Sequence, residues 1–210
     1  MSEQLISQKS YSVEEYLALE RVAEQRHEYH AGAMRAMAGG SRNHGALGAG
    51  IVTELTLMTR GTNCTTFNGD VKVRIDQEDR FLYPEASVVC GKVEGSDLDK
   101  HCITNPVLIT EVLSPSTEAY DRGRKFMLYQ LLPSLREYVL IDQNRPVVST
   151  FYKNDQGIWE SYFYAGLEDQ VEIRSLGARI NMAILYAKVE DLGPVFDPQE
   201  EEKIGPDPSE

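Results

Sequence analysis

Hydrophobic and polar positions alternate at helical spacing near the start of the chain. Ser12 precedes the sequence VEEYLALERVAEQ, and Glu15 stands three residues later, which is the arrangement of a capping box. The pattern predicts an amphipathic helix over residues 13–26. The following stretch, HEYHAGAMRAM, alternates like a pair of short strands, and Gly32 permits a tight turn between them. We therefore expect an N-terminal β-hairpin after the first helix.

A second helix and a long series of strands follow. Ser41 is positioned to cap a helix over residues 42–60, which Gly61 would end. Runs rich in β-branched and aromatic residues then predict strands at CTTF, DVKVRI, FLYPEASVVC, PVLITEVL, EYVLID and VEIR, with a hairpin in VVSTFYKNDQGIWESYFY. Further helices are predicted from Thr117 to Leu132 and over residues 181–188. This order predicts an α/β fold with a mixed sheet, not regular βαβ alternation.

Composition fits one soluble domain over residues 1–192. The chain has 210 residues, of which 41% are hydrophobic, and it contains no apolar run of the ~20 residues that a membrane span needs. The polar N-terminus does not resemble a signal peptide. Three cysteines without C-x-x-C spacing predict free thiols in a reducing cytoplasm. Residues 193–210, rich in proline and acid, are predicted to be a disordered tail.

The net charge of −12 disfavours nonspecific binding to DNA, which depends on Lys and Arg. Residues 197–210 contribute −5 of this charge, and the remainder of the chain is still acidic at −7. A DNA-binding protein of this composition needs a local basic patch. Four residues besides Lys125 are candidates for contact with DNA: Lys72, Arg74, Arg122 and Arg124.

Glu111 is unusual because it interrupts an apolar strand, and a buried carboxylate needs compensation. Glu85 belongs to the preceding strand, and Lys125 to the helix after Glu111. If the two strands are neighbours, both carboxylates and the lysine converge at one end of the sheet. Two carboxylates and a lysine suit Mg²⁺-assisted phosphodiester hydrolysis, since Mg²⁺ prefers oxygen ligands and the lysine can stabilise the phosphate.

Simpler interpretations exist for each of these residues. Isolated glutamates in strands are commonly solvated at an edge, and Lys125 could pair with Asp121 one helical turn earlier. His44 could serve as a ligand or base, but a histidine near a helix start is more often a capping or surface residue. Glu28 in isolation suits a solvated acid at the start of a hairpin. Spacing alone leaves these alternatives open.

Several longer motifs resemble one known family. They are YSVEEYLAL, EYHAGAMRAMAGGSRNH, YPEASVVCG and LITEVLSPSTEAYDRGRKFMLYQLLPSLREYVLID, and they occur in that order. Over residues 11–190 the chain resembles the Uma family of putative restriction endonucleases, a PD-(D/E)XK nuclease-like group. The resemblance implies a restriction-endonuclease-like core, a mixed β-sheet flanked by helices. It also implies an Mg²⁺-dependent (or Mn²⁺-dependent) endonuclease that acts on DNA, expected to be cytoplasmic and homodimeric.

The resemblance also implies roles for particular residues. Glu85 and Glu111 match the metal ligands. Leu113 occupies the usual lysine position of the motif, and Lys125 is the matching lysine, displaced onto the helix. Glu28 and His44 fall within the family's N-terminal E…G…M…H pattern and become further catalytic candidates.

Glu85 marks a departure, because the family usually has Asp after this proline. Glutamate reaches one methylene further, and Mg²⁺ tolerates little geometric error. An inactive nuclease-fold relative is therefore the alternative. Such a protein would act as a DNA- or protein-binding module, for example through its acidic tail.

Overall fold

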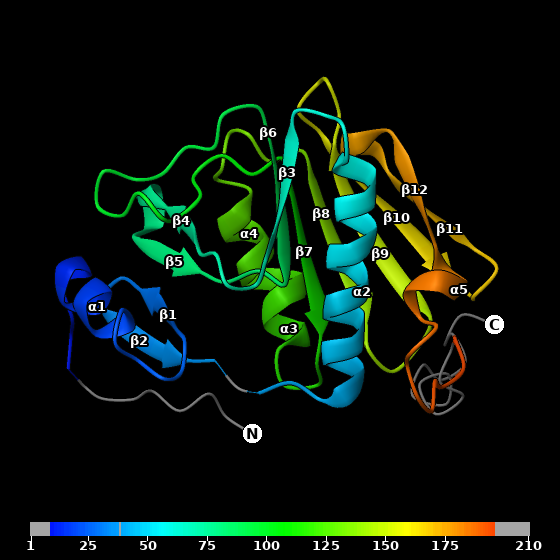
Figure 1. The fold of residues 1–210 in the computed structure, drawn as a ribbon, viewed down its shortest axis with the longest axis horizontal. Helices are drawn as coiled ribbons and strands as arrows, with labels where there is room; N and C mark the ends of the chain where they lie inside the picture. Colours follow the sequence, from blue (N-terminus) through cyan, green and yellow to red (C-terminus); the bar gives the residue numbers. More distant parts are fainter. Residues whose placement is uncertain (1–8, 38, 196–210) are drawn as a thin grey trace, which may run out of the picture.

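A computed structural model describes residues 9–37 and 39–195. Its centre is a six-stranded sheet in the order β10-β9-β8-β7-β6-β3 (Figure 1). Strands β7 and β8 pair in parallel, while the other neighbours are antiparallel. Helices flank this mixed sheet, which confirms the predicted fold class. The strand bounds are β3 (Cys64–Asn68), β6 (Ala86–Cys90), β7 (Leu108–Leu113), β8 (Glu137–Asp142), β9 (Val147–Lys153) and β10 (Trp159–Ala165).

Alternation along β7 divides the core into two layers. Leu108 and Val112 point towards α2 (Arg42–Thr59), which buries Leu47, Ile51 and Leu55 against the sheet. Ile109 and Leu113 belong to the second layer, which contains Leu128, Tyr129, Tyr138 and Leu140. Glu111 is two residues from both Ile109 and Leu113, so its side chain lies on the same face of β7 as theirs. Its side chain therefore projects towards the helical segment after β7.

That helical segment differs from the single helix predicted from Thr117 to Leu132. It consists of α3 (Glu118–Tyr120), a π-helical stretch over Asp121–Lys125, labelled η2, and α4 (Phe126–Tyr129). Both Asp121 and Lys125 are buried in the π-helical stretch. Short π segments often occur at functional sites. The chain thus adopts an irregular helix where its candidate lysine enters the core.

A second, smaller sheet lies beside the first, in the order β2-β1-β5-β4 (Figure 1). Its strands are β1 (His27–His30), β2 (Ala33–Ala36), β4 (Val73–Ile75) and β5 (Arg80–Leu82). The predicted hairpin is present as β1 and β2. The single run FLYPEASVVC, in contrast, divides between β5 and β6 in different sheets. Pro84 lies at the break, where it cannot donate a backbone hydrogen bond to continue a strand.

The first helix is shorter than predicted and ends at Glu20, as α1 (Val13–Glu20). The capping box of Ser12 and Glu15 is present as expected. The Glu20 carboxylate then accepts hydrogen bonds from the backbone and from the ring of His27. These contacts accompany the reversal of the chain into β1, which prevents the helix from reaching residue 26.

The C-terminal part adds a two-stranded sheet of β11 (Gln170–Ile173) and β12 (Ala178–Asn181), followed by α5 (Met182–Leu185). The sequence pattern missed β12, and it predicted a longer final helix. Short 3₁₀ segments, η1 (Asp76–Glu78) and η3 (Arg174–Leu176), complete the described elements. Most of the predicted tail, residues 196–210, lies outside the described residues. No described helix is long and apolar enough to span a membrane.

The expectation of three free cysteines was wrong. Cys64 of β3 stands directly opposite Cys90 of β6, and the two form a disulfide. Spacing along the chain did not indicate this bond, because it follows from the pairing register of two strands. Cys102 is a buried free thiol.

Candidate functional site

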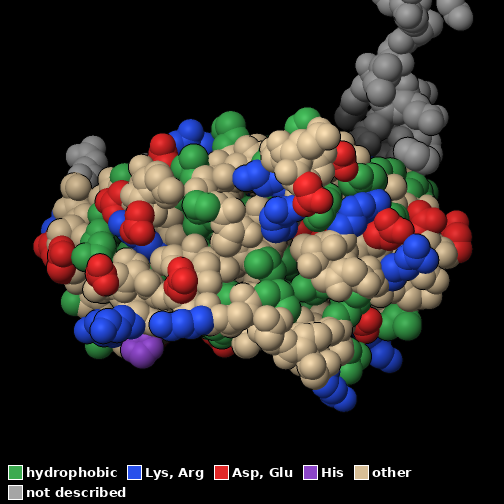
Figure 2. Space-filling model, turned by 90° about the horizontal axis from the view of Figure 1, so that it is seen from above, with side chains coloured by type: hydrophobic (Ala, Val, Ile, Leu, Met, Phe, Trp, Pro, Cys, Tyr) green, Lys and Arg blue, Asp and Glu red, His purple; other side chains and the backbone are tan. Residues whose placement is uncertain are grey.

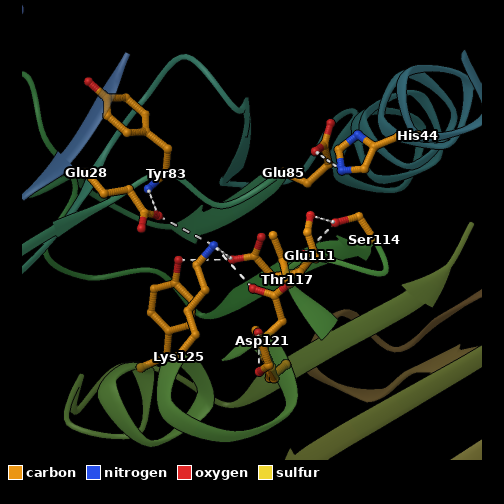
Figure 3. Close-up of polar contacts among 12 residues, drawn as sticks. Glu28, His44, Tyr83, Glu85, Glu111, Ser114, Thr117, Asp121 and Lys125 are labelled. Atoms are coloured by element: carbon orange, nitrogen blue, oxygen red, sulfur yellow. Dashed lines mark hydrogen bonds and ion pairs between the residues drawn. The ribbon is translucent and has the colours of Figure 1, made fainter. Parts of the chain in front are cut away.

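Glu111 lies in the middle of the sheet, only 5% exposed. Two groups compensate its burial, and both contact the same oxygen. Lys125 Nζ lies 2.8 Å from Oε1 of Glu111 (Figure 3). The hydroxyl of Tyr129 donates a hydrogen bond of 3.1 Å to the same oxygen. A carboxylate in this apolar strand is thus held by a cation and a phenol from the following helical segment.

Lys125 is surrounded by acidic groups. Besides Glu111, its ammonium lies 3.6 Å from Oε1 of Glu28 and 3.7 Å from Oδ1 of Asp121 (Figure 3). The pairing with Asp121, considered as the simpler interpretation, therefore coexists with the pairing to Glu111. Burial disfavours the charged ammonium, but the three carboxylates outweigh it and raise the pKa of Lys125 well above its usual value. Lys125 is a fixed positive charge in the core.

The carboxylates around Lys125 differ from one another. Burial raises the pKa of Glu111 to about 8, although the Lys125 ammonium acts in the opposite direction. Burial likewise raises the pKa of Asp121. For Glu28, burial is outweighed by Lys125 and by hydrogen bonds from His30 and from the backbone N–H of Tyr83, so its pKa is lowered. Glu28 is the more firmly ionised partner of Lys125.

Glu85 stands just before β6, opposite Glu111. The pairing of β6 with β7 sets Ala86 against Thr110, and one further step along this register sets Glu85 against Glu111. The Glu85 side chain extends towards α2, where its Oε2 lies 3.7 Å from Nε2 of His44 (Figure 3). Burial raises the pKa of Glu85, while His44 and Lys125 oppose that effect.

Gly48 of α2 makes room for the Glu85 carboxylate. A Cβ at this position would overlap Oε1 of Glu85. Glycine inside a helix costs about 1 kcal/mol relative to alanine. The close approach of the Glu85 oxygen explains why glycine occupies this position despite that cost. Helix α2 therefore carries His44 and, at Gly48, also leaves space for the Glu85 carboxylate that His44 contacts.

The four candidate DNA-contacting residues all pair with carboxylates. Lys72 contacts Asp99 at 2.8 Å, and the buried Arg74 contacts Asp76 and Asp79. On the outer helical surface, Arg122 pairs with Glu118 at 2.8 Å and Arg124 with Glu78 at 3.4 Å. On the face shown in Figure 2, basic and acidic side chains are interspersed.

Sequence reasoning missed three groups that complete the site: His30, Tyr83 and Tyr129. His30 lies two residues after Glu28 and therefore on the same face of β1. Tyr129 lies four residues after Lys125, so a helical period could have placed both near Glu111. The contribution of Tyr83 comes from its backbone N–H, and no residue pattern indicates such a contact.

No group of three or more His, Cys, Asp or Glu side chains suited to a metal occurs among the described residues. Glu85, just before β6, and Glu111 of β7 form an acidic pair on neighbouring strands of the sheet. Both offer oxygen donors, which suit Mg²⁺ or Mn²⁺ rather than zinc. The Glu85 carboxylate contacts His44, whereas the Glu111 carboxylate contacts Lys125 and Tyr129.

Comparisons with known proteins agree with this architecture. Residues 13–184 match the Uma2 family, described as "Putative restriction endonuclease". The uncharacterized protein slr1290 of Synechocystis sp. is 37% identical over 175 residues, which span 83% of this chain and 90% of that protein. A second Synechocystis protein, the uncharacterized sll1609, is 33% identical over 135 residues, covering 64% of this chain and 76% of its own length.

One solved structure shares the fold. The crystal structure of a putative nuclease belonging to DUF820, from Anabaena variabilis, matches with a TM-score of 0.68 at 15% sequence identity. The match covers 84% of this chain and 98% of that one.

Proposed function

Because the chain belongs to the Uma2 family of putative restriction endonucleases, we propose that it is a metal-dependent DNA endonuclease of the PD-(D/E)XK type. One observation carries the proposal: the buried Lys125 ammonium lies 2.8 Å from Glu111 on a central strand. Glu85 stands opposite Glu111, one position beyond the paired residues Ala86 and Thr110 of the neighbouring strands. In this proposal Glu85 and Glu111 hold the ion, and Lys125 lies beside Glu111.

The donor set fits a hard divalent cation. Lys125 and Tyr129 both contact Oε1 of Glu111, and we assign its second oxygen to the cation. Glu85 is the second proposed ligand, and Mg²⁺ can be held by two carboxylates because it retains several waters. When bound, Mg²⁺ or Mn²⁺ would polarise the phosphate and make a coordinated water more acidic.

The other proposed roles, in contacting the phosphate and in moving protons, belong to side chains around the two carboxylates. Lys125 stays protonated, so its ammonium can donate a hydrogen bond to a phosphate oxygen or hold the attacking water in line. Glu28 and Asp121 restrict the position of that ammonium from the other side. His44 lies beside Glu85 and is partly exposed, so it can exchange a proton with a water that enters there.

A plasmid-cleavage assay tests this proposal. Wild-type protein should convert supercoiled DNA to nicked or linear forms with Mg²⁺ or Mn²⁺ and should stop in EDTA. Glu111→Gln should reduce the rate by at least about 10²-fold, because the amide cannot replace an anionic ligand. Glu24→Gln changes an exposed acid of the same charge and should cleave at the wild-type rate. Equal cleavage by all three proteins would contradict the assignment.

The alternative is an inactive relative that binds DNA or protein, and Glu85 is the residue that decides between the two. If the longer side chain misplaces its oxygen, Glu85→Asp should raise the cleavage rate. If both proteins bind Mn²⁺ and neither cleaves, the binding-module alternative is favoured. Faster cleavage by wild type would mean instead that the strand geometry suits glutamate. A homodimeric assembly stays a prediction, which analytical ultracentrifugation can check.

A further inference from the structure

The two faces of the small sheet have opposite character. On one face, Tyr29 and Phe81 pack with Tyr16 of α1 in an aromatic cluster. Alternation along β1 sends Glu28 and His30 to the other face. Glu28 lies 3.6 Å from Lys125, so this polar face is directed at the candidate active site.

Two arginines share the polar face. Strand pairing sets Arg35 opposite Glu28 and Arg80 opposite His30. Directly opposed residues of antiparallel strands project to the same side of a sheet. Tyr120 of α3 lies against this face, with its ring 6.2 Å from that of His30. The charges of Glu28, Lys125, Arg35 and Arg80 all act on its hydroxyl.

Two hydrogen-bond donors here are buried without an acceptor. They are Nε of Arg80 and the hydroxyl of Tyr120, and neither makes a hydrogen bond to a described residue. Arg80 also forms no ion pair with any residue that the structure describes. A buried donor without a partner costs about 1–3 kcal/mol. Two such donors beside one active site indicate an acceptor that is supplied from outside the chain.

We propose that Arg80 and Tyr120 form a phosphate subsite beside Lys125. It would bind a phosphate of the nucleic-acid backbone next to the one that is hydrolysed, and in this respect it rests on the proposed function. Guanidinium and hydroxyl donors suit phosphate oxygens, and Arg35 on the same face adds positive charge. The subsite also provides a local basic group in an acidic chain, whereas Lys72, Arg74, Arg122 and Arg124 are neutralised by carboxylates.

Tyr120→Phe separates a ligand role from a structural one. Removing a buried hydroxyl without a partner should leave the melting temperature unchanged or raise it. The same change should weaken binding of a fluorescent DNA duplex about threefold, measured by anisotropy in Ca²⁺. A hydroxyl with a purely structural role would not give an intact fold together with weaker binding. Wild-type affinity in Tyr120→Phe would remove the hydroxyl from the proposal.

Arg80→Gln tests the charge, with Arg60→Gln as the matched control at an exposed position. We expect Arg80→Gln to bind the duplex about tenfold more weakly, as for the loss of a charged hydrogen bond. Its slope of log affinity against log salt concentration should also be shallower by about 0.9, the value for one lost phosphate contact. Arg60→Gln should bind like wild type. If Arg80→Gln matches Arg60→Gln in affinity and slope, the subsite is refuted.

A third measurement distinguishes failure of the subsite from failure of the nuclease proposal. If wild type binds no duplex, inorganic phosphate replaces DNA as the probe. A rise in melting temperature with phosphate for wild type and Arg60→Gln, absent in Arg80→Gln, would support a subsite for a free phosphate or nucleotide while the nuclease proposal fails. An equal response of all three proteins to phosphate would refute the subsite.

Discussion

The two halves of the candidate site differ in how completely the protein surrounds them. Lys125 and Glu111 have side chains that are each 7% exposed, at a separation of 2.8 Å. His44 and Glu85 have side chains that are 23% and 26% exposed, at 3.7 Å. The first pair is built into the core between the two sheets. The second pair lies at the end of α2, where a cation or substrate can reach it.

This difference indicates that stability and activity depend on the two halves unequally. A buried ammonium with three carboxylates is part of the packing, so a change there affects folding as well as chemistry. A partly exposed carboxylate with one histidine contributes little to folding. Substitutions in the two halves should therefore separate the two properties.

The largest effect is expected at Lys125. Lys125→Met keeps much of the side-chain volume but leaves Glu111, Glu28 and Asp121 without their shared cation. Breaking a buried ion pair in this way typically destabilises a protein by about 3–5 kcal/mol. Urea denaturation would measure it, and Arg124→Met, whose side chain is 54% exposed, is the control. If both variants lose equally little stability, the buried half is less coupled to folding than the contacts imply.

A smaller, pH-dependent effect is expected at Glu111. Burial raises the folded-state pKa to about 8, above the usual value near 4.5. The stability contributed by this group is therefore complete below about pH 4.5 and is lost as the pH rises through 8. In EDTA, wild type should lose up to about 5 kcal/mol relative to Glu111→Gln across that window. Thermal melts at closely spaced pH values measure the difference. A constant difference would mean that folding leaves the pKa of Glu111 at its usual value.

The smallest effect on stability, but a large effect on activity, is expected at Gly48. Alanine there would displace the Glu85 carboxylate, which is the end of a flexible side chain. The helix itself gains up to about 1 kcal/mol from the substitution. Gly48→Ala should thus keep its melting temperature and lose metal-dependent cleavage. Gly45→Ala, in the same helix with open space around its Cβ position, should keep both. Full activity in Gly48→Ala would remove Glu85 from the site.

Local patterns predicted the pairing of Lys125 with Glu111 but not the groups around that pair. The apolar strand around Glu111 and the helical period after it were sufficient to bring Lys125 to that carboxylate. The contact between Lys125 and Glu28 depends on how the small sheet docks against the large one. Neither a residue pattern nor spacing encodes that docking.

Strand pairing accounts for two of the failures. The run FLYPEASVVC looked continuous because it is apolar at both ends, yet Pro84 lies where it divides between two sheets. Likewise, the disulfide between Cys64 and Cys90 follows from the register of β3 and β6. Other elements separate β3 from β6 along the chain, so no short turn indicates that the two strands pair. From a single sequence, the positions of strands can be predicted more readily than which strands pair with one another.

The most direct test of the central claim is Mn²⁺ binding by isothermal titration calorimetry, on wild type, Glu85→Gln and Glu111→Gln. If the two carboxylates share one ion, wild type should bind one Mn²⁺ per chain, and each single substitution should weaken that binding at least about tenfold. Glu24→Gln should bind like wild type. Unchanged Mn²⁺ affinity in both Glu85→Gln and Glu111→Gln would contradict a shared metal site.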